Sequence, residues 1–311
     1  MMKNKIDISI IIPVYNEEKS INPLFEEIIK ALNNISNWEL IFIDDGSSDS
    51  SKLVISDIVK KNKNIKLISF LKNKGKSEAL NAGFKICKGK KVVTIDADLQ
   101  DDPAEIYNII NKLDDGFDMV SGWKINRKDP FSKTLPSKLF NFILKCITGI
   151  KIHDFNCGLK GYRLEVVKTL NIYGGLHRFI PVLAKHNGFE ISEIKVNHRE
   201  RKYGKSKYGT SRLFHGFYDL ITLMFFNKYL NRPLHFFGLI GIICLIFGIS
   251  INLYLTFNWF NGLWITPFKN PIFFLGILLI IIGVQFFSIG LIGELIVRFH
   301  KKDDNNYYID E

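Results

Sequence analysis

One stretch of 65 residues, Pro233–Val297, carries only two charged side chains, Lys269 and Glu294. The other 246 positions hold the remaining 71 charged residues. A segment this apolar needs to be shielded from water, whereas the rest of the chain is too polar to enter lipid. The chain therefore has a polar globular part and an apolar tail, which argues against a wholly soluble protein and against a polytopic transporter.

The apolar tail contains two runs without a charge, Leu234–Phe257 and Ile272–Gly293. At about 1.5 Å per residue, each run is long enough to cross a hydrocarbon core of ~30 Å as a helix. Basic residues lie outside the pair, at Arg232 and within residues 298–302, whereas the loop between the runs has only Lys269. The positive-inside rule therefore predicts a multi-pass protein of the cell (inner) membrane, with the globular part and both termini cytoplasmic. Two buried core helices are the alternative.

Residues Leu213–Leu230 are apolar and aromatic, but they also carry charged and ionisable side chains. They follow a basic loop and precede the first run, a position that favours an amphipathic helix in the membrane interface over a buried core helix. The sequence thus predicts four parts: a globular domain over 1–212, an interface helix over 213–232, a two-span hairpin over 233–297 and a cytoplasmic tail over 298–311.

Small residues recur on one face of the second run. Gly276, Gly283 and Gly290 are seven residues apart, so they share one face of a helix. Such a face lets two helices approach closely. It predicts either packing within the hairpin or a contact in a homo-oligomer, and the sequence leaves both open.

The first 120 residues alternate apolar, β-rich runs with helical patterns. This order predicts an α/β fold, with a parallel sheet and helices on both of its faces. In such sheets ligands bind at the carboxyl ends of the strands. The predicted strands are Ile6–Ile12, Glu39–Ile43, Ile65–Phe70, Lys91–Ile95 and Phe117–Ser121, with further strands at Gly158–Tyr162 and Phe189–Asn197.

The fourth predicted strand is followed by a cluster of acids and amides, Asp96–Asp102. Asp96 and Asp98 flank one small residue, so both can reach the same cation. Carboxylates of this kind suit Mg²⁺ or Mn²⁺, ions that commonly also hold substrate phosphates. Residues 101–103 are explained as the start of a helix, but that reason does not cover Asp96 and Asp98.

Polar residues also follow the first three predicted strands, in the segments Pro13–Glu18, Asp44–Asp49 and Asn73–Gly83. Each segment could merely cap the next helix. Polar residues at four strand ends on one edge of the sheet nevertheless favour a nucleotide site. The sequence has neither a GxGxxG nor a GxxxxGK[ST] fingerprint, so dinucleotide-binding and P-loop proteins are disfavoured.

These segments, PVYNEE, DDGSSD, NKGKSEALNAG and DADLQDDP, resemble those of the family-2 inverting glycosyltransferases of the GT-A fold. Three later segments resemble the polyprenyl-phosphate hexose synthase branch (dolichyl-phosphate mannose synthase-like), and the two-span tail is similar to that of its bacterial members. The likeness covers about residues 6–212, and its later segments are Asp154–Arg163, His177–Phe179 and Arg201–Tyr208.

The resemblance implies a role for individual residues. The donor nucleotide sugar would be bound by Pro13, Tyr15, Glu17, Asp45, Lys76 and Asp96. The metal would be held by Asp96, Asp98 and Gln100, and Asp98 and Asp154 would be catalytic. The phosphate of the acceptor would be met by Lys124, Lys133, Ser137 and Arg201. Many relatives have Gly-Ser-Arg after the fifth strand, where this chain has Gly122-Trp123-Lys124, so Lys124 would supply charge without the fork of an arginine.

The expected function is that of a membrane-bound enzyme. It would move a hexose, with inversion, from a nucleotide sugar (UDP-glucose or GDP-mannose) to polyprenyl (undecaprenyl or dolichyl) phosphate, using Mg²⁺ or Mn²⁺. The formal net charge of +11 fits an anionic acceptor beside a lipid bilayer, although a basic surface facing lipid headgroups alone explains it equally.

Two alternatives remain. The acceptor could be the hydroxyl of a glycolipid or of diacylglycerol, and Asp154 would then be an essential base. The chain could instead be a catalytically silent membrane scaffold that binds a nucleotide sugar. Nucleic acid is not an expected partner, because the basic residues cluster beside the predicted spans. Whether Asp154 and His177 are catalytic or structural stays open.

Overall fold

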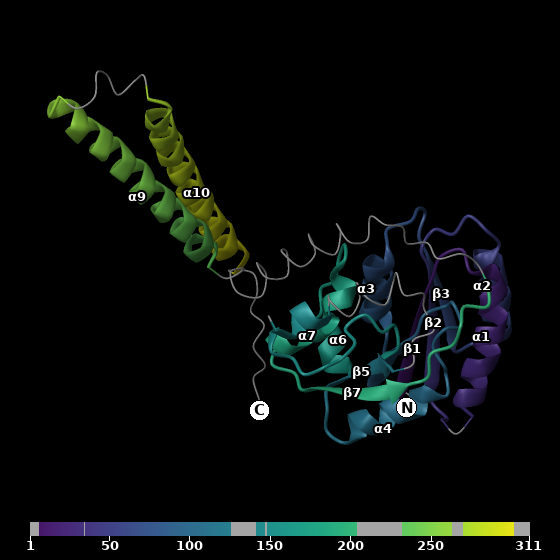
Figure 1. Ribbon diagram of the computed structural model, residues 1–311. Coiled ribbons are helices and arrows are strands. Elements are labelled where there is room, and N and C mark those ends of the chain that lie inside the picture. Colours follow the sequence, from purple (N-terminus) through teal and green to yellow (C-terminus); the bar gives the residue numbers. More distant parts are fainter. Residues whose placement is uncertain are drawn as a thin grey trace. The chain divides into compact units, whose positions relative to one another are not determined.

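The computed structural model forms two compact units, Met1–Leu220 and Ile221–Glu311 (Figure 1). The predicted interface helix over 213–232 lies almost wholly outside the described residues, and so do Lys133, Ser137 and nearly all of the tail over 298–311. The structure describes residues 6–33, 35–125, 141–146, 148–203, 232–262 and 270–301.

The first unit is built on a seven-stranded sheet with the order β3-β2-β1-β4-β6-β5-β7. Strands β1 to β4 are parallel neighbours, as predicted, and the apolar residues of β1, β2 and β4 are almost all buried. The strands are β1 Ile8–Val14, β2 Trp38–Asp44, β3 Ile65–Ser69, β4 Lys91–Thr94, β5 Met119–Lys124, β6 Lys160–Arg163 and β7 Ile191–Val196.

Helices cover both faces of this sheet, as predicted. Ile10 and Ile12 of β1 belong to a buried cluster with Leu24 of α1, whereas Ile11 points to the other face, close to Gly83 of α3. Because successive side chains of a strand point to opposite faces, β1 contributes to a core on each face of the sheet. Burying each isoleucine stabilises the fold by about 1.5–3 kcal/mol. The helical elements are α1 Glu18–Ala31, α2 Ser51–Lys61, α3 Lys76–Ile86, α4 Glu105–Asp114, α6 Leu164–Thr169, η1 Leu176–Phe179 and α7 Ile180–His186.

The sheet differs from the prediction in one strand. β6 runs antiparallel between β4 and β5, pairing Thr94 with Lys160 on one side and Ser121 with Lys160 on the other. The chain leaves β5 at the carboxyl edge of the sheet and returns to the same edge at residue 159. A strand that enters at the carboxyl edge runs towards the amino edge, antiparallel to its neighbours, so the sheet is mixed. β7 then pairs with β5 in the parallel sense.

The second unit is a helical hairpin of α9 Pro233–Phe260 and α10 Pro271–Lys301, which lie side by side in Figure 1. By length and composition, both helices could cross a membrane, and most of their side chains are exposed. The recurring glycines face α9: a Cβ on Gly283 would lie 2.8 Å from the Gly241 carbonyl oxygen, and one on Gly248 would lie 2.7 Å from that of Gly276. The small-residue face therefore serves packing within the hairpin.

Candidate active site

The carboxyl ends of β1, β2 and β4 surround a cavity of about 350 Å³. It is open to solvent on one side and combines a tyrosine ring and apolar atoms with acidic and basic side chains. Eight residues that the sequence singled out line it together, although they come from segments up to 188 positions apart. The lining residues are Pro13, Val14, Tyr15, Glu17, Asp45, Asn73, Gly75, Lys76, Ala79, Asp96, Ala97, Asp98 and Arg201.

Asp45, directly after β2, binds the loop that follows β3 and holds it beside the cavity. Its carboxylate accepts hydrogen bonds from the Asn73 amide at 3.0 Å, from the Lys74 N–H at 2.7 Å and from the Gly75 N–H at 3.0 Å. Gly75 has a φ of +96°, which a side chain would strain. Burial raises the pKa of Asp45 despite these bonds. The aspartate thus shapes the wall between β2 and β3.

The loop after β1 is held by the loop after β2. Asn16 has a φ of +52°, and its side-chain oxygen accepts from the Ser48 N–H at 2.7 Å, while its own N–H donates to Ser47 Oγ at 2.9 Å. The next N–H, that of Glu17, donates to Ser51 Oγ at 2.9 Å. These bonds fix the turn that precedes α1 and places Glu17 in the cavity lining.

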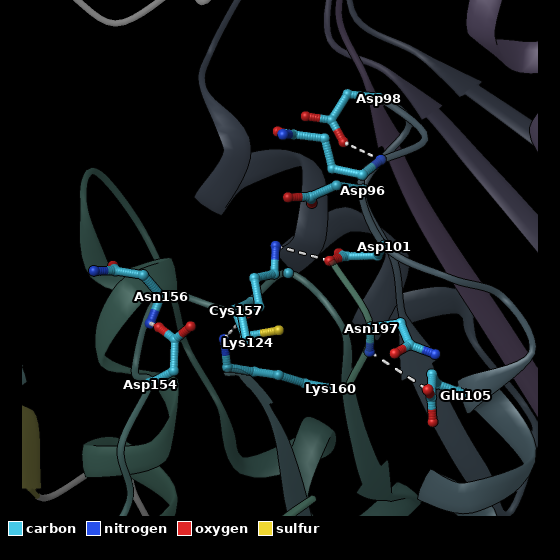
Figure 2. A network of polar contacts seen from close by, with 12 residues as sticks. Asp96, Asp98, Asp101, Glu105, Lys124, Asp154, Asn156, Cys157, Lys160 and Asn197 are labelled. Carbon is cyan, nitrogen blue, oxygen red and sulfur yellow. Dashed lines mark hydrogen bonds and ion pairs between the residues drawn. The ribbon is translucent and has the colours of Figure 1, made fainter. Parts of the chain in front are cut away.

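Asp96 and Asp98 occupy the centre of the site, above the end of β4 (Figure 2). Lys76 Nζ lies 2.5 Å from Asp96 Oδ1. Burial alone would raise the pKa of Asp96, but the charge and hydrogen bond of Lys76 lower it on balance. Burial and the charges of Asp96 and Asp101 raise the pKa of Asp98. The two carboxylates therefore differ: Asp96 forms a close ion pair with Lys76, whereas the more distant Arg201 and Lys124 only partly offset the burial and like charges at Asp98.

Backbone strain sits in the same loop. Leu99 is buried and has a φ of +61°, which costs a non-glycine residue about 1–3 kcal/mol. Together with Asn16 it makes up the non-glycine residues of positive φ in the described chain, and both lie in loops of the site. The turn at Leu99 lets the Gln100 N–H donate to Asp98 Oδ1 at 3.2 Å. Gln100 itself is not part of the cavity lining.

Gly158, just before β6, supports Asp96 from below. A Cβ at this position would lie 2.5 Å from Asp96 Cγ, so glycine leaves the space in which the carboxylate rests. The Gly158 carbonyl oxygen in turn accepts from Thr94 Oγ1 of β4 at 3.0 Å. No role for Gly158 is predicted from the sequence, since its contact with Asp96 depends on the antiparallel entry of β6.

Lys124, at the end of β5, points to Asp101 rather than into the cavity (Figure 2). Its Nζ lies 2.7 Å from Asp101 Oδ1, and the Asp101 side chain is 1% exposed. Burial alone would lower the pKa of Lys124, but Asp101 raises it above its ordinary value. The same surroundings raise the pKa of the neighbouring Cys157 thiol, with burial as the main cause, to about 12. The cysteine is thus a protonated packing residue, and Lys124 is firmly charged.

Asp154 and Lys160 lie close to Lys124 and Cys157, outside the cavity lining (Figure 2). Asp154 is 2% exposed, and its Oδ1 accepts from the Asn156 N–H at 3.0 Å. Lys160 Nζ donates to the Cys157 carbonyl oxygen, and burial lowers the pKa of this lysine. Both groups hold the turn between residues 154 and 160 that carries Gly158.

His177 is anchored on α3. Ser77 Oγ accepts the His177 backbone N–H at 3.0 Å and lies 2.9 Å from Nδ1 of the ring. Burial, with the charges of Lys76, Arg178 and Lys160, lowers the pKa of His177 well below its usual range. The ring is therefore neutral at physiological pH and is held by Ser77.

Arg201 lines the cavity from the segment that follows β7. Its Nη2 lies 2.5 Å from Glu17 Oε1 and 3.6 Å from Asp98 Oδ2. The sequence expectation was a contact with the phosphate of an acceptor. The guanidinium lies at Glu17 and Asp98, two carboxylates of the expected donor and metal sites, and contact with an acceptor phosphate stays a prediction.

The donor set fits a divalent cation. Across the residues that the structure describes, no three His, Cys, Asp or Glu side chains are arranged to hold a metal on their own. Asp96 and Asp98 nevertheless supply hard oxygen ligands side by side, and burial together with the charges of Asp96 and Asp101 raises the pKa of Asp98. Mg²⁺ and Mn²⁺ sites often have just one or two carboxylates and complete the shell with water and substrate phosphates.

The α/β fold with this cavity defines a glycosyltransferase domain. The family model for glycosyl transferase family 2 matches residues 9–170, and the chain belongs to that family. The match covers β1 to β6, and with them all of the cavity lining except Arg201.

Two curated relatives match nearly the whole chain, including the hairpin. A dodecaprenyl-phosphate galacturonate synthase of Rhizobium johnstonii is 36% identical over 308 residues, which cover 96% of this chain and 90% of the relative. An undecaprenyl-phosphate 4-deoxy-4-formamido-L-arabinose transferase of Shewanella sediminis is 36% identical over 312 residues, covering 98% and 92%. Both relatives are named as polyprenyl-phosphate sugar transferases, the branch that the sequence motifs indicate.

The fold has counterparts among solved structures. Glucosyl-3-phosphoglycerate synthase from Mycobacterium tuberculosis, crystallised with Mn²⁺, UDP-glucose and phosphoglyceric acid, aligns with a TM-score of 0.53 over 71% of this chain and 79% of its own. The two sequences are 18% identical, so the likeness concerns the fold. It confirms the predicted GT-A architecture of the globular part.

Proposed function

We propose that this chain transfers a sugar from a nucleotide-sugar donor to polyprenyl phosphate at the surface of a membrane. The observation that carries the proposal is the cavity in which Asp96, Asp98 and Arg201 meet at the carboxyl edge of the sheet. The carboxylates suit a cation that binds a nucleotide diphosphate, and the guanidinium suits the phosphate of an acceptor. The kinship with polyprenyl-phosphate sugar transferases supports the lipid acceptor.

On the donor side, Pro13, Tyr15, Glu17 and Asp45 would bind the base and ribose, and Lys76 would bind near the phosphates. Asp96 and Asp98, with Gln100 beside them, would hold the divalent cation. When bound, Mg²⁺ or Mn²⁺ would neutralise the charge that develops on the departing diphosphate. The solved counterpart with Mn²⁺ and UDP-glucose supports this assignment.

On the acceptor side, the proposal assigns Arg201, with Lys133 and Ser137, to the lipid phosphate. Lys124, which pairs with Asp101 outside the cavity lining, would have to turn away from Asp101 to join them. A phosphate monoester is mostly ionised at neutral pH, so its oxygen can attack the anomeric carbon without a strong base. Attack from the face opposite the diphosphate inverts the configuration. Positioning and charge stabilisation then supply most of the rate. The burial of Asp154 supports an orienting role and speaks for a phosphate acceptor rather than a hydroxyl that needs a base.

The membrane part follows from the substrate. A polyprenyl tail stays in the bilayer, so the active site has to work at its surface. We propose that the hairpin over 233–297 anchors the enzyme in the inner membrane, that an interface helix over 213–232 joins it to the globular domain over 1–212, and that this domain and the tail over 298–311 are cytoplasmic. The two long apolar helices support this topology.

The sugar is the finest part of the proposal. UDP-glucose and GDP-mannose are the donors expected from the sequence, and the names of the relatives add nucleotide-linked galacturonate and 4-deoxy-4-formamido-L-arabinose as further donors to test. All share a nucleoside diphosphate, for which the cavity is built, and they differ in the sugar alone.

A transfer assay tests the function. Purified full-length protein in detergent would receive each radiolabelled nucleotide sugar with undecaprenyl phosphate and Mg²⁺ or Mn²⁺, and label in the organic phase would be counted. We expect transfer from one donor, abolished by EDTA and by Asp98→Asn. Diacylglycerol replaces the acceptor in a parallel arm. Transfer to diacylglycerol alone would reassign the acceptor, and no transfer from any donor, with or without metal, would overturn the proposal.

A further inference from the structure

The segment that follows β7 is bound to the loop that carries Asp96 and Asp98. His198 forms an antiparallel bridge with Asp101, and the Arg199 N–H donates to the Gln100 carbonyl oxygen at 2.8 Å. These backbone contacts lay the segment across the carboxylate loop. Backbone contacts alone do not fix the side chains of this segment.

The side chain of Arg199 supplies a second attachment. Its Nη1 lies 2.6 Å from Glu27 Oε2 on α1, and its Nη2 lies 2.8 Å from Asp102 Oδ1, ahead of α4. The Arg199 side chain is 34% exposed and lies outside the cavity lining. An arginine is suited to such a double contact, because its planar fork presents two fixed donors. One residue thus ties the segment both to α1 and to the loop ahead of α4.

Arg201 follows after a single residue, Glu200. Its Nη2 lies within ion-pair distance of Glu17 and Asp98, and its side chain is 22% exposed. Two residues span at most about 7 Å of extended chain. Fixing Arg199 therefore restricts where the Cα of Arg201 can lie, and with it the reach of the guanidinium.

We propose that Arg199 is a positioning residue for the transfer reaction: its forked pair with Glu27 and Asp102 holds Arg201 at the carboxylates of the cavity. The proposal rests on the proposed function, in which Arg201 meets phosphate. A misplacement of about 1 Å in a charged group at the reacting centre can cost on the order of a hundredfold in rate. Arg199 reduces the freedom of Arg201 before any substrate arrives.

A double-mutant cycle tests whether Arg199 acts through Arg201. Wild type, Arg199→Gln, Arg201→Lys and the double variant would be compared as full-length proteins in the transfer assay. We expect Arg199→Gln to lower kcat about tenfold with little change in the donor KM, because the cavity lining is kept. In the Arg201→Lys background the same change should cost less than about twofold. An equal loss in both backgrounds, or no loss in the first, would overturn the proposal.

Two variants of the same pair and one control sharpen the cycle. Glu27→Gln should reproduce part of the loss, and Arg199→Lys should fall between wild type and Arg199→Gln, because lysine keeps the charge without the fork. Arg163→Gln is the matched control. Arg163 bonds the Phe117 carbonyl oxygen and faces Asp118 at the opposite edge of the sheet, so its loss should leave kcat unchanged.

Hydrogen–deuterium exchange gives a readout that does not need transfer. In Arg199→Gln, amides of residues 197–203 should exchange at least about fivefold faster than in wild type, since their clamp is lost. Arg163→Gln should leave that peptide unchanged. If wild type transfers no sugar, the proposed function fails, whereas this measurement still decides on the clamp: an unchanged exchange rate in Arg199→Gln would overturn it.

Discussion

Two carboxylates at opposite edges of the sheet, Glu39 and Asp98, have contrasting surroundings. At the amino edge, Glu39 of β2 is 1% exposed and fully bonded: it accepts from Ser9 Oγ at 2.6 Å, from Lys66 Nζ at 2.6 Å and from the Lys88 N–H at 2.7 Å. At the carboxyl edge, Asp98 shares its surroundings with two further aspartates.

The pKa values express this difference. Burial would raise the pKa of Glu39, but Lys66, Ser9 and Lys88 lower it on balance. For Asp98, burial and like charges act together and raise it. A carboxylate that stabilises the fold has its partners within the chain, whereas one that serves a ligand is left short of positive charge. Four changes break or sharpen this contrast, from the largest expected effect to the smallest.

Asp98→Asn should have the largest effect on transfer. It removes a ligand charge for the expected cation without changing the size of the side chain, and we expect transfer to fall by about 10²–10³-fold. The melting temperature should stay the same or rise, because one of three crowded carboxylates is neutralised. Transfer assays and thermal melts on the same preparation measure both. Full activity would mean that Asp98 is no different from a structural carboxylate.

Gly158→Ala should reduce transfer by about a hundredfold. The new Cβ would occupy the place of the Asp96 carboxylate and displace it from Lys76. Gly188→Ala is the contrasting variant: its φ of +91° predicts strain in an otherwise open place, so it should lower the melting temperature and spare the activity per folded molecule. The expectation fails if both variants lose activity in proportion to stability.

Glu39→Gln should act on stability alone. It breaks the charged bond with Lys66 and weakens the bonded cluster at the amino edge, at a cost of about 1–3 kcal/mol in the free energy of unfolding. The activity of the folded enzyme should be unchanged. Lys60→Gln, which breaks an exposed ion pair with Asp57, is the control and should leave the melting temperature unaltered. A loss of kcat in Glu39→Gln would show that the two edges are coupled.

The smallest effect is the pH dependence of that loss. Because folding lowers the pKa of Glu39, its contribution to stability is present above the unfolded value of 4.5 and disappears as the pH falls through the lower folded value. The difference in melting temperature between wild type and Glu39→Gln should therefore be constant from pH 7 to about 5 and shrink below it. A difference that grows on acidification would contradict the assignment.

The sequence predicted what depends on local pattern. Polar residues after the predicted strands indicated where the cavity lies, since parallel strands bring their carboxyl ends to one edge of the sheet. Asp45, Lys76 and Asp96 thus meet in the structure although up to 51 positions separate them. The strand β3, Ile65–Ser69, lies within the predicted run Ile65–Phe70 and begins at the same residue.

What the sequence could not predict depends on pairing between distant segments. The antiparallel course of β6 was missed, since a four-residue strand carries no mark of its direction. With it were missed the place of Gly158 under Asp96 and the pairing of Lys124 with Asp101. Arg199 carried no signal either: a basic residue in a basic loop is ordinary, and its partners on α1 and before α4 are remote in sequence.

The position of β6 also affects the order of events during synthesis. The sheet cannot close until β6 and β7 have been made, because β6 fills the gap between β4 and β5. β7 ends at Val196, and α9 begins at Pro233, 37 residues later. At about 5–20 residues per second, roughly 2–7 s of translation separate the two. The sheet therefore has only these few seconds in which to form before the first apolar helix begins to be synthesised.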